Sequence, residues 1–301
     1  MAFVLLFPAD SLERSQVERD YKAEWLAAQN AGFETVLFDF DALRRGDNLE
    51  AVLRRVPKTK VPQTLIYRGW MLRAEEYTRL FDGLERRGRN LINSPEAYRF
   101  AHHLPKNYEL WRTVMPETVW LERTRFEREG EADFASIFEV LQPFGSGAVV
   151  LKDWVKSQKH DWTGACFIPD ASDQSQVRRV VNRFLQLTGE NLAGGLVFRR
   201  FVPLREVAGQ TIEWRSFWLD GRMLSLAPHF ARREELKAPD APRFEELAQR
   251  APSRFFSLDI AQTQAGDWMI IEMGDGGVSG LAAGDDVEGW YANLAKRERA
   301  T

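Results

Sequence analysis

The chain has 301 residues, of which 44% are hydrophobic and 12% aromatic, and its 41 basic and 44 acidic side chains leave a formal net charge of −3. This composition excludes a wholly disordered polypeptide, and the near-neutral charge excludes a dedicated polyanion-binding protein. The single cysteine, Cys166, excludes a disulfide scaffold and a cysteine-rich zinc site, so we expect a reducing, cytoplasmic location. No apolar run approaches the length of a membrane span, and no membrane association is expected.

The first 90 residues alternate between strand and helix patterns. Apolar runs predict strands over residues 2–7, 35–40 and 64–67. Apolar residues at helical spacing predict helices over residues 15–31, 43–55 and 75–87. This order of elements predicts a small parallel α/β module over residues 1–90.

The pattern changes beyond residue 90, so we expect a second domain over residues 91–301. An aromatic helical stretch reaches residue 110, and strands dominate after it. The predicted strands lie at residues 118–121, 148–152, 196–202, 213–219, 222–228, 254–262 and 268–273, with helices at 132–142 and 174–188. The polar residues 285–301 predict a solvated terminal helix. The fold class is therefore α/β followed by an α+β body.

Two apolar runs around an Ala265-Gly266 turn predict a hairpin that carries acidic residues. If Gln264 faces Asp267, Asp259 lies directly opposite Glu272, on the face that is not continuously apolar. Like charges across a strand pair are destabilising, and a divalent cation removes that penalty. Asp275, just past the strand end, adds a third oxygen donor, and oxygen ligands suit Mg²⁺ or Mn²⁺. The alternative is two unrelated surface acids on a hairpin whose register differs by one residue.

A second hairpin turns at Asp220-Gly221 and places Arg215 among apolar side chains on one face. A guanidinium in such surroundings needs an anionic partner, either a phosphate or a structural acid such as Glu213. Lys152 ends a buried strand before a polar loop, where it reaches an anionic ligand or simply extends its amine into water. Lys156 and Ser157 follow in that loop, which is a candidate phosphate-binding segment.

The order of these pieces resembles the ATP-grasp superfamily over about residues 90–285. The likeness rests on Lys152, the hinge-like strand 197–204, the Arg215 hairpin and the acidic hairpin with Asp259, Glu272 and Asp275. The segment Leu151-Lys152-Asp153-Trp154-Val155-Lys156-Ser157 is similar to an uncharacterised bacterial and phage branch of these proteins. It is also similar to the eukaryotic cell-division-cycle protein that assembles a translation initiation factor.

The resemblance implies an ATP-grasp fold of two α+β subdomains with ATP between them. It assigns ATP phosphates to Lys152 and Lys106, the adenine border to Phe201 and Val202, and the ribose to Glu206. Mg²⁺ is assigned to Asp259, Glu272 and Asp275, and the transferred phosphate to Arg215. The chain departs from the family pattern in two places: Gly274 stands where many relatives have a metal-binding asparagine, and Arg199-Arg200 stand where most have a hinge glutamate.

The leading hypothesis is an ATP- and Mg²⁺-dependent ligase that activates a carboxylate as an acyl phosphate for attack by an amine or a similar nucleophile. Its acceptor is a small molecule, a peptide or a protein. One alternative is an ATP-binding assembly factor without ligation. Another is a nucleic-acid-directed enzyme, because arginine pairs recur at residues 44–45, 54–55, 86–87, 178–179 and 232–233.

Two further residues have open roles in the sequence. Arg68 follows a predicted strand near Trp70 and Arg73, and it either lines the acceptor pocket or lies on the surface at the strand end. His160 lies in the predicted phosphate loop, and none of the histidines has metal-ligand spacing.

Overall fold

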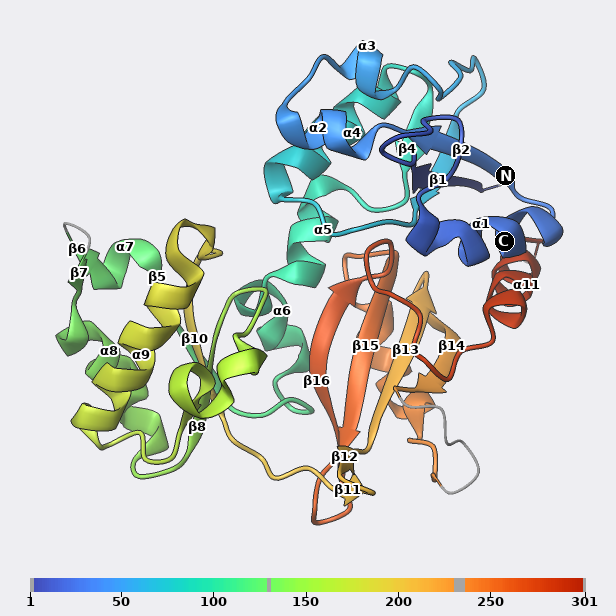
Figure 1. Ribbon diagram of the computed structural model, residues 1–301. Coiled ribbons are helices and arrows are strands. Elements are labelled where there is room, and N and C mark those ends of the chain that lie inside the picture. Colours follow the sequence, from blue (N-terminus) through green and yellow to red (C-terminus); the bar gives the residue numbers. More distant parts are fainter. Residues whose placement is uncertain (1–2, 129–130, 230–235, 300–301) are drawn as a thin grey trace. The chain divides into compact units, whose positions relative to one another are not determined.

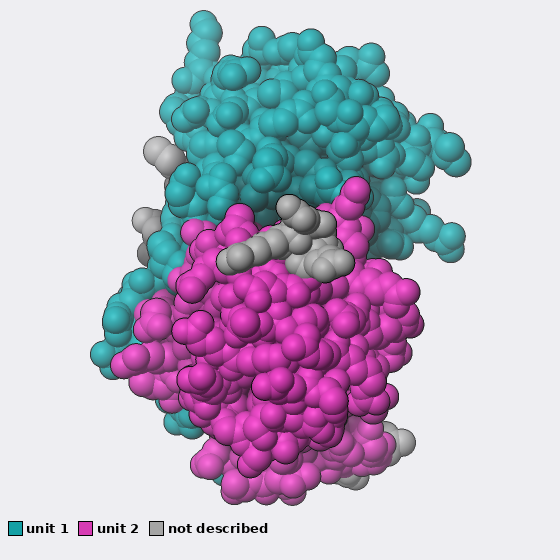
Figure 2. All heavy atoms as spheres, turned by 90° about the vertical axis from the view of Figure 1, so that its left-hand side faces the viewer, with its two compact units in different colours: residues 1–101, 212–260, 272–301 teal, residues 102–211, 261–271 magenta. Residues whose placement is uncertain are grey.

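The computed structural model describes residues 3–128, 131–229 and 236–299 (Figure 1). The chain divides into two compact units, coloured separately in Figure 2. Unit 1 comprises Met1–Ala101, Ile212–Ile260 and Glu272–Thr301, and unit 2 comprises His102–Thr211 and Ala261–Ile271. The N-terminal module and the C-terminal strands thus belong to one compact unit, a grouping that differs from the predicted division at residue 90.

The N-terminal module of unit 1 is a parallel sheet of four strands in the order β2-β1-β3-β4. Its strands are β1 (Val4–Pro8), β2 (Glu34–Phe38), β3 (Gln63–Tyr67) and β4 (Arg89–Leu91). Its helices are α1 (Lys22–Asn30), α2 (Phe40–Arg45), α3 (Leu49–Val52), α4 (Ala74–Glu85) and α5 (Pro95–His102). The predicted parallel α/β module is confirmed. The sequence pattern missed β4, because its three residues are too few and too polar to show a strand period.

The helix predicted over residues 43–55 is instead two short helices. Asp39 caps α2 through Ala42 N–H, and Gly46 ends it with a φ of +82°. Asn48 then caps α3 through Glu50 N–H. The prediction failed because these local caps interrupt an apolar spacing that continues across the break.

The second sheet of unit 1 has the strand order β14-β13-β15-β16. Its strands are β13 (Glu213–Leu219), β14 (Arg222–Pro228), β15 (Phe255–Gln262) and β16 (Trp268–Asp275), and the helices around it are α10 (Glu245–Gln249) and α11 (Val287–Arg299). The predicted turn between β13 and β14 is confirmed: Asp220 and Gly221 have φ values of +49° and +73°, the combination that a type I′ hairpin needs.

A β-bulge between Phe217 and Trp218 shifts the register of β13 against β14. Arg215 therefore faces Ala227 and not Leu226, which the turn alone would place opposite it. The next residue on this face of β14 is His229, whose N–H donates to Glu213 O at 2.9 Å.

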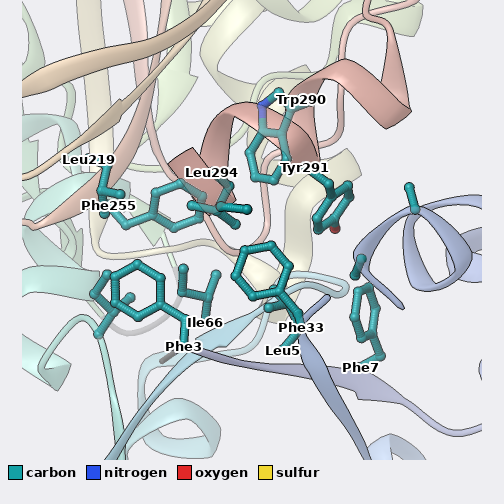
Figure 3. Packing of buried hydrophobic residues seen from close by; sticks show 14 of the residues in the cluster. Phe3, Leu5, Phe7, Phe33, Ile66, Leu219, Phe255, Trp290, Tyr291 and Leu294 are labelled. Carbon is teal, nitrogen blue, oxygen red and sulfur yellow. The ribbon is translucent and has the colours of Figure 1, made fainter. Parts of the chain in front are cut away.

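One hydrophobic core of unit 1 joins both sheets with α1 and α11. Figure 3 shows Phe3, Leu5, Phe7, Phe33, Ile66, Leu219, Phe255, Trp290, Tyr291 and Leu294 packed together. In α11, Trp290 is 2% exposed and Tyr291 and Leu294 are fully buried, so the expectation of a solvated terminal helix is wrong. The polar composition of this segment concealed an apolar stripe at helical spacing. A second core lies on the other face of the parallel sheet, under α2, α3 and α4.

Unit 2 is built on an antiparallel sheet in the order β5-β10-β8-β9. These strands are β5 (Thr118–Glu122), β10 (Gly195–Arg200), β8 (Val149–Asp153) and β9 (Phe167–Ile168). Its helices are α6 (Leu104–Trp111), α7 (Arg123–Phe126), α8 (Phe134–Leu141) and α9 (Gln174–Thr188), and its remaining strands are β6 (Glu127–Arg128), β7 (Glu131–Ala132), β11 (Glu206–Val207) and β12 (Gln210–Thr211). Side chains from α8, α9 and one face of this sheet form its core. In the described part of the chain, no helix is long and apolar enough to cross a membrane.

Arg68, just after β3, is buried inside unit 1 with only 1% of its surface exposed. Its guanidinium binds both carboxylate oxygens of Glu24 on α1, at 2.8 and 3.0 Å. It also donates to the backbone oxygens of Gly276 and Ser279, and its Cζ lies 5.3 Å from the ring centroid of Trp290. Glu24 in turn accepts a 2.7 Å bond from Tyr291 Oη. Both expectations for Arg68, a pocket residue or a surface residue, are therefore wrong.

Replacing Arg68 should destabilise unit 1 strongly, because it leaves Glu24 as a buried carboxylate without its cation. We expect Arg68→Met to lower the free energy of unfolding by about 3–5 kcal/mol, measured by urea denaturation. The control is Arg254→Met, which breaks the ion pair with Asp220 at the surface and should cost about 1 kcal/mol or less. Equal effects of the two substitutions would contradict this account of Arg68.

Candidate functional site

Asp259 and Arg215 form the charged centre of the β13–β15 part of unit 1. Arg215 Nε lies 2.8 Å from Asp259 Oδ1, and Arg215 Nη2 lies 2.8 Å from Asp259 Oδ2. Arg215 Nη1 donates to Gly280 O at 2.8 Å. Of the two anions that the sequence allowed for Arg215, the structure supplies an acid, and this acid is Asp259 and not Glu213.

His229 approaches the same carboxylate from the end of β14. Its Nε2 is buried and lies 3.3 Å from Asp259 Oδ1, close enough to act on the carboxylate but not aligned as a hydrogen-bond donor. Burial by itself raises the pKa of Asp259, but the bonds from Arg215 and the contact with His229 outweigh it and hold the pKa at about 2. Asp259 is therefore an anion at neutral pH. Sequence reasoning missed His229, because without the bulge it falls on the other face of β14.

Glu272 on β16 acts on the same guanidinium. Burial lowers the pKa of Arg215, yet the bond from Asp259 and the charges of Asp259 and Glu272 raise it overall. Two carboxylates on neighbouring strands therefore surround one cation. Mg²⁺ in nucleotide sites is held by one or two carboxylates together with substrate phosphates, so Asp259 and Glu272 have the chemistry to hold it. Over the described residues, no group of three or more His, Cys, Asp or Glu side chains is arranged to hold a metal ion by itself.

Asp275, the third acid of the predicted metal site, has other partners. It is 2% exposed, and its carboxylate accepts bonds from Asn93 Nδ2 at 2.6 Å and Gly277 N–H at 2.8 Å. Asn93 also donates to Phe255 O at 2.7 Å and accepts from Arg254 N–H at 2.9 Å. Asp275 thus joins the end of β16 to the N-terminal module.

The loop of the acidic hairpin differs from the prediction by one residue. Thr263 N–H donates to Asp267 O at 2.8 Å, and Gly266 N–H donates to Thr263 O at 2.9 Å, with a φ of +96° at Gly266. This is a three-residue loop closed by a glycine in the left-handed region, so the prediction that Gln264 faces Asp267 is wrong. Counting from the turn therefore no longer places Asp259 opposite Glu272. Their shared action on Arg215 is the evidence that brings them together.

Lys152 lies in unit 2, on the face of the sheet that points away from α8 and α9. Its neighbour Leu151 belongs to the core, and strand alternation puts Lys152 on the opposite face, where it is paired in register with Val197. Asp153 shapes the loop that follows: its carboxylate accepts bonds from the N–H groups of Val155 and Lys156. These bonds hold the backbone that carries Lys156, which is exposed, and Ser157, which is half-buried.

The other predicted nucleotide residues also lie in unit 2. Phe201 packs edge-on against Phe167, with ring centroids 5.0 Å apart, and near Trp162 at 6.4 Å. Val202 is half-buried, and Lys106 on α6, Glu206 on β11 and His160 are exposed. The structure thus leaves these side chains accessible, and their roles toward ATP remain predictions.

The structure resembles solved ATP-grasp proteins over nearly its whole length. It matches the D-cycloserine synthetase DcsG with a TM-score of 0.59 at 14% sequence identity, covering 98% of this chain and 99% of that chain. It matches the ATP-grasp ligase PsnB, complexed with minimal precursor, Mg and ADP, with a TM-score of 0.56 at 12% identity over 99% and 98% of the two chains. It matches the macrocyclase MdnC from Microcystis aeruginosa MRC, bound with precursor peptide MdnA, with a TM-score of 0.55 at 12% identity over 98% and 99%. The likeness establishes the fold, which is that of the ATP-grasp proteins.

Residues 143–294, about half of the chain, match the model of an ATP-grasp domain family, the family numbered 3 within its clade. The chain therefore belongs to this ATP-grasp family, and the resemblance predicted from the sequence is confirmed. The match to C-terminally truncated Cdc123 from Schizosaccharomyces pombe has a TM-score of 0.40 over 59% of this chain, which is too low to support a shared function. No curated protein matches the sequence.

The partners of Asp275 predict a measurable pH dependence of stability. Burial raises the pKa of Asp275 from 3.8 to about 6, against the lowering effect of Asn93 and Gly277. A raised folded-state pKa gives a contribution that is fully present below pH 3.8 and is lost as the pH rises through about 6. Asp275→Asn lacks this titration. With chelator present, we expect the free energy of unfolding of the wild type, relative to Asp275→Asn, to fall by about 1 kcal/mol between about pH 5 and about pH 7. A difference that stays constant or rises over this interval would contradict the burial of a poorly compensated carboxylate.

Proposed function

We propose that this protein is an ATP- and Mg²⁺-dependent ligase that activates a carboxylate as an acyl phosphate for attack by an amine or a similar nucleophile. The observation that carries the proposal is the arrangement of Asp259 and Glu272 around Arg215 on adjacent strands of unit 1. Two carboxylates suit a metal that carries phosphates, and a guanidinium suits the phosphate itself. Membership of the ATP-grasp family supports the same chemistry.

In this proposal, Asp259 and Glu272 hold Mg²⁺, which neutralises phosphate charge when bound. Asp275, predicted as a third ligand, keeps the structural role that Asn93 and Gly277 give it. Mn²⁺ is a suitable substitute for Mg²⁺ because it takes the same oxygen ligands.

Arg215 binds the phosphoryl group that is transferred. A carboxylate oxygen of the substrate attacks the γ-phosphorus, the bond to the β-phosphate oxygen breaks, and ADP leaves. The nucleophile then attacks the acyl carbon, loses a proton and displaces inorganic phosphate. Catalysis consists of positioning and charge stabilisation, and no activated serine or cysteine is required.

The side chains of unit 2 have the nucleotide roles that the sequence predicted. We assign phosphate contacts to Lys152, Lys156, Ser157 and Lys106, adenine contacts to Phe201 and Val202, and a ribose contact to Glu206. The support is their accessibility together with the shaped loop after β8.

The acceptor class is a peptide or a small molecule. PsnB and MdnC are described with precursor peptides, and DcsG is a D-cycloserine synthetase. No observation favours a nucleic acid. Several arginines of the sequence pairs have partners within the fold: Arg45 binds Asp47, Arg87 is buried against Glu50, and Arg178 lies over Phe134. The pair 232–233 lies outside the described residues.

The metal assignment predicts a Mg²⁺-dependent stabilisation by ATP. At saturating concentrations, ATP with Mg²⁺ should raise the melting temperature by about 3 °C or more beyond ATP alone. Asp259→Asn and Glu272→Gln should abolish the Mg²⁺-dependent part, and Asp275→Asn should keep it. Lys152→Met should reduce the shift with or without Mg²⁺, whereas Lys58→Met, at an exposed surface position, should not. Loss of the Mg²⁺ effect in Asp275→Asn alone would return the metal to the predicted third ligand.

Release of ADP and phosphate separates a ligase from an ATP-binding assembly factor. The enzyme is assayed with a panel of carboxylates, including acidic peptides, each paired with amines. A ligase releases both products only when a suitable pair is present, and Arg215→Lys should lower kcat by about 100-fold or more, because a point charge replaces a bidentate donor. Tight Mg-ATP binding without product release across the panel, together with a stable protein partner, would favour the assembly factor.

A further inference from the structure

Arg215 occupies the carboxylate that the proposed function gives to the metal. Its Nε and Nη2 atoms lie 2.8 Å from the two oxygens of Asp259, one on each. A divalent cation at Asp259 needs at least one of these oxygens and is repelled by a guanidinium in contact with them. The two cations therefore compete for one carboxylate.

The same guanidinium has a second anchor that does not depend on Asp259. Its Nη1 donates to Gly280 O at 2.8 Å, just past the loop oxygens of Gly276 and Ser279 that Arg68 binds. This anchor keeps Arg215 near the site when its other two nitrogens leave Asp259. A phosphate offers those nitrogens a bidentate partner of higher charge than a carboxylate.

We propose that Arg215 is an exchangeable counter-ion for Asp259: it holds the carboxylate until a nucleotide phosphate takes the guanidinium, so that the divalent cation binds together with the nucleotide and only weakly before it. This inference rests on the proposed function in its assignment of Asp259 to the metal. Asp259 keeps one neighbour through the exchange, because His229 Nε2 approaches Oδ1, whereas Oδ2 accepts its bond from Arg215 Nη2.

The exchange is tested without nucleotide, by titrating the full chain with Mn²⁺ and measuring free Mn²⁺ by electron paramagnetic resonance. Wild type should bind Mn²⁺ weakly, and Arg215→Gln should bind it at least about tenfold more tightly, because the competing cation is gone. The matched control is Arg254→Gln, which removes another bidentate arginine from an aspartate, Asp220, outside the site. It should leave Mn²⁺ binding at the wild-type level. Adding Asp259→Asn to Arg215→Gln should remove the gained affinity and so locate the ion at Asp259.

Arg215→Lys is measured beside Arg215→Gln, and both are checked by thermal denaturation. The lysine amine occupies fewer carboxylate oxygens, so we expect an intermediate gain of about threefold in Mn²⁺ affinity. The inference is overturned if wild type already binds Mn²⁺ as tightly as the variants, or if no folded Arg215 variant binds it more tightly than wild type. Failure of the proposed function has a different signature: the Mn²⁺ gain is present, but ATP stabilises neither wild type nor variant and no ADP forms.

Discussion

The buried guanidinium of Arg68 is the constraint on which the rest of unit 1 depends. Burying a charge is costly unless it is paired and hydrogen-bonded, and Arg68 meets this need with Glu24, two backbone oxygens and the rings of Phe217 and Trp290. These partners come from α1, α11, β13 and the loop after β16. One side chain therefore joins the N-terminal module to the strands that carry the charged site, which explains why residues 1–101 group with the C-terminal strands.

The loop after β16 transmits this constraint to the site. Arg68 holds its oxygens at Gly276 and Ser279, and Arg215 binds the next one, at Gly280. Asp275 fixes the start of the loop through Asn93. Arg215 and its carboxylate partner are thus held by rigid strands on one side and by a bonded loop on the other. Such preorganisation matters for phosphoryl transfer, where the protein contributes mainly position and charge.

Much of this was predictable from the sequence, and the exceptions have physical causes. The parallel module, the Asp220-Gly221 turn and the two charged hairpins follow from local apolar periods and turn residues, which act over a few neighbours. The bulge at Phe217 carries no such local signal, and it alone brings His229 to the face of Arg215. Arg68 was misjudged because its partners lie far away in the sequence. The same is true of Asp275, since Asn93 is 182 residues distant. Charge pairs of this kind are decided by tertiary packing, which no single segment encodes.

The central claim is that Asp259 and Glu272 hold the divalent cation of a nucleotide complex and that Arg215 faces its phosphates. Anomalous diffraction from crystals grown with Mn²⁺ and a non-hydrolysable ATP analogue tests it most directly. The account predicts an anomalous peak within about 2.0–2.3 Å of oxygens from Asp259 and Glu272, with Arg215 turned from Asp259 to the terminal phosphate. A peak held by Asp275, or an ordered nucleotide complex in which Arg215 still binds both oxygens of Asp259, would contradict it.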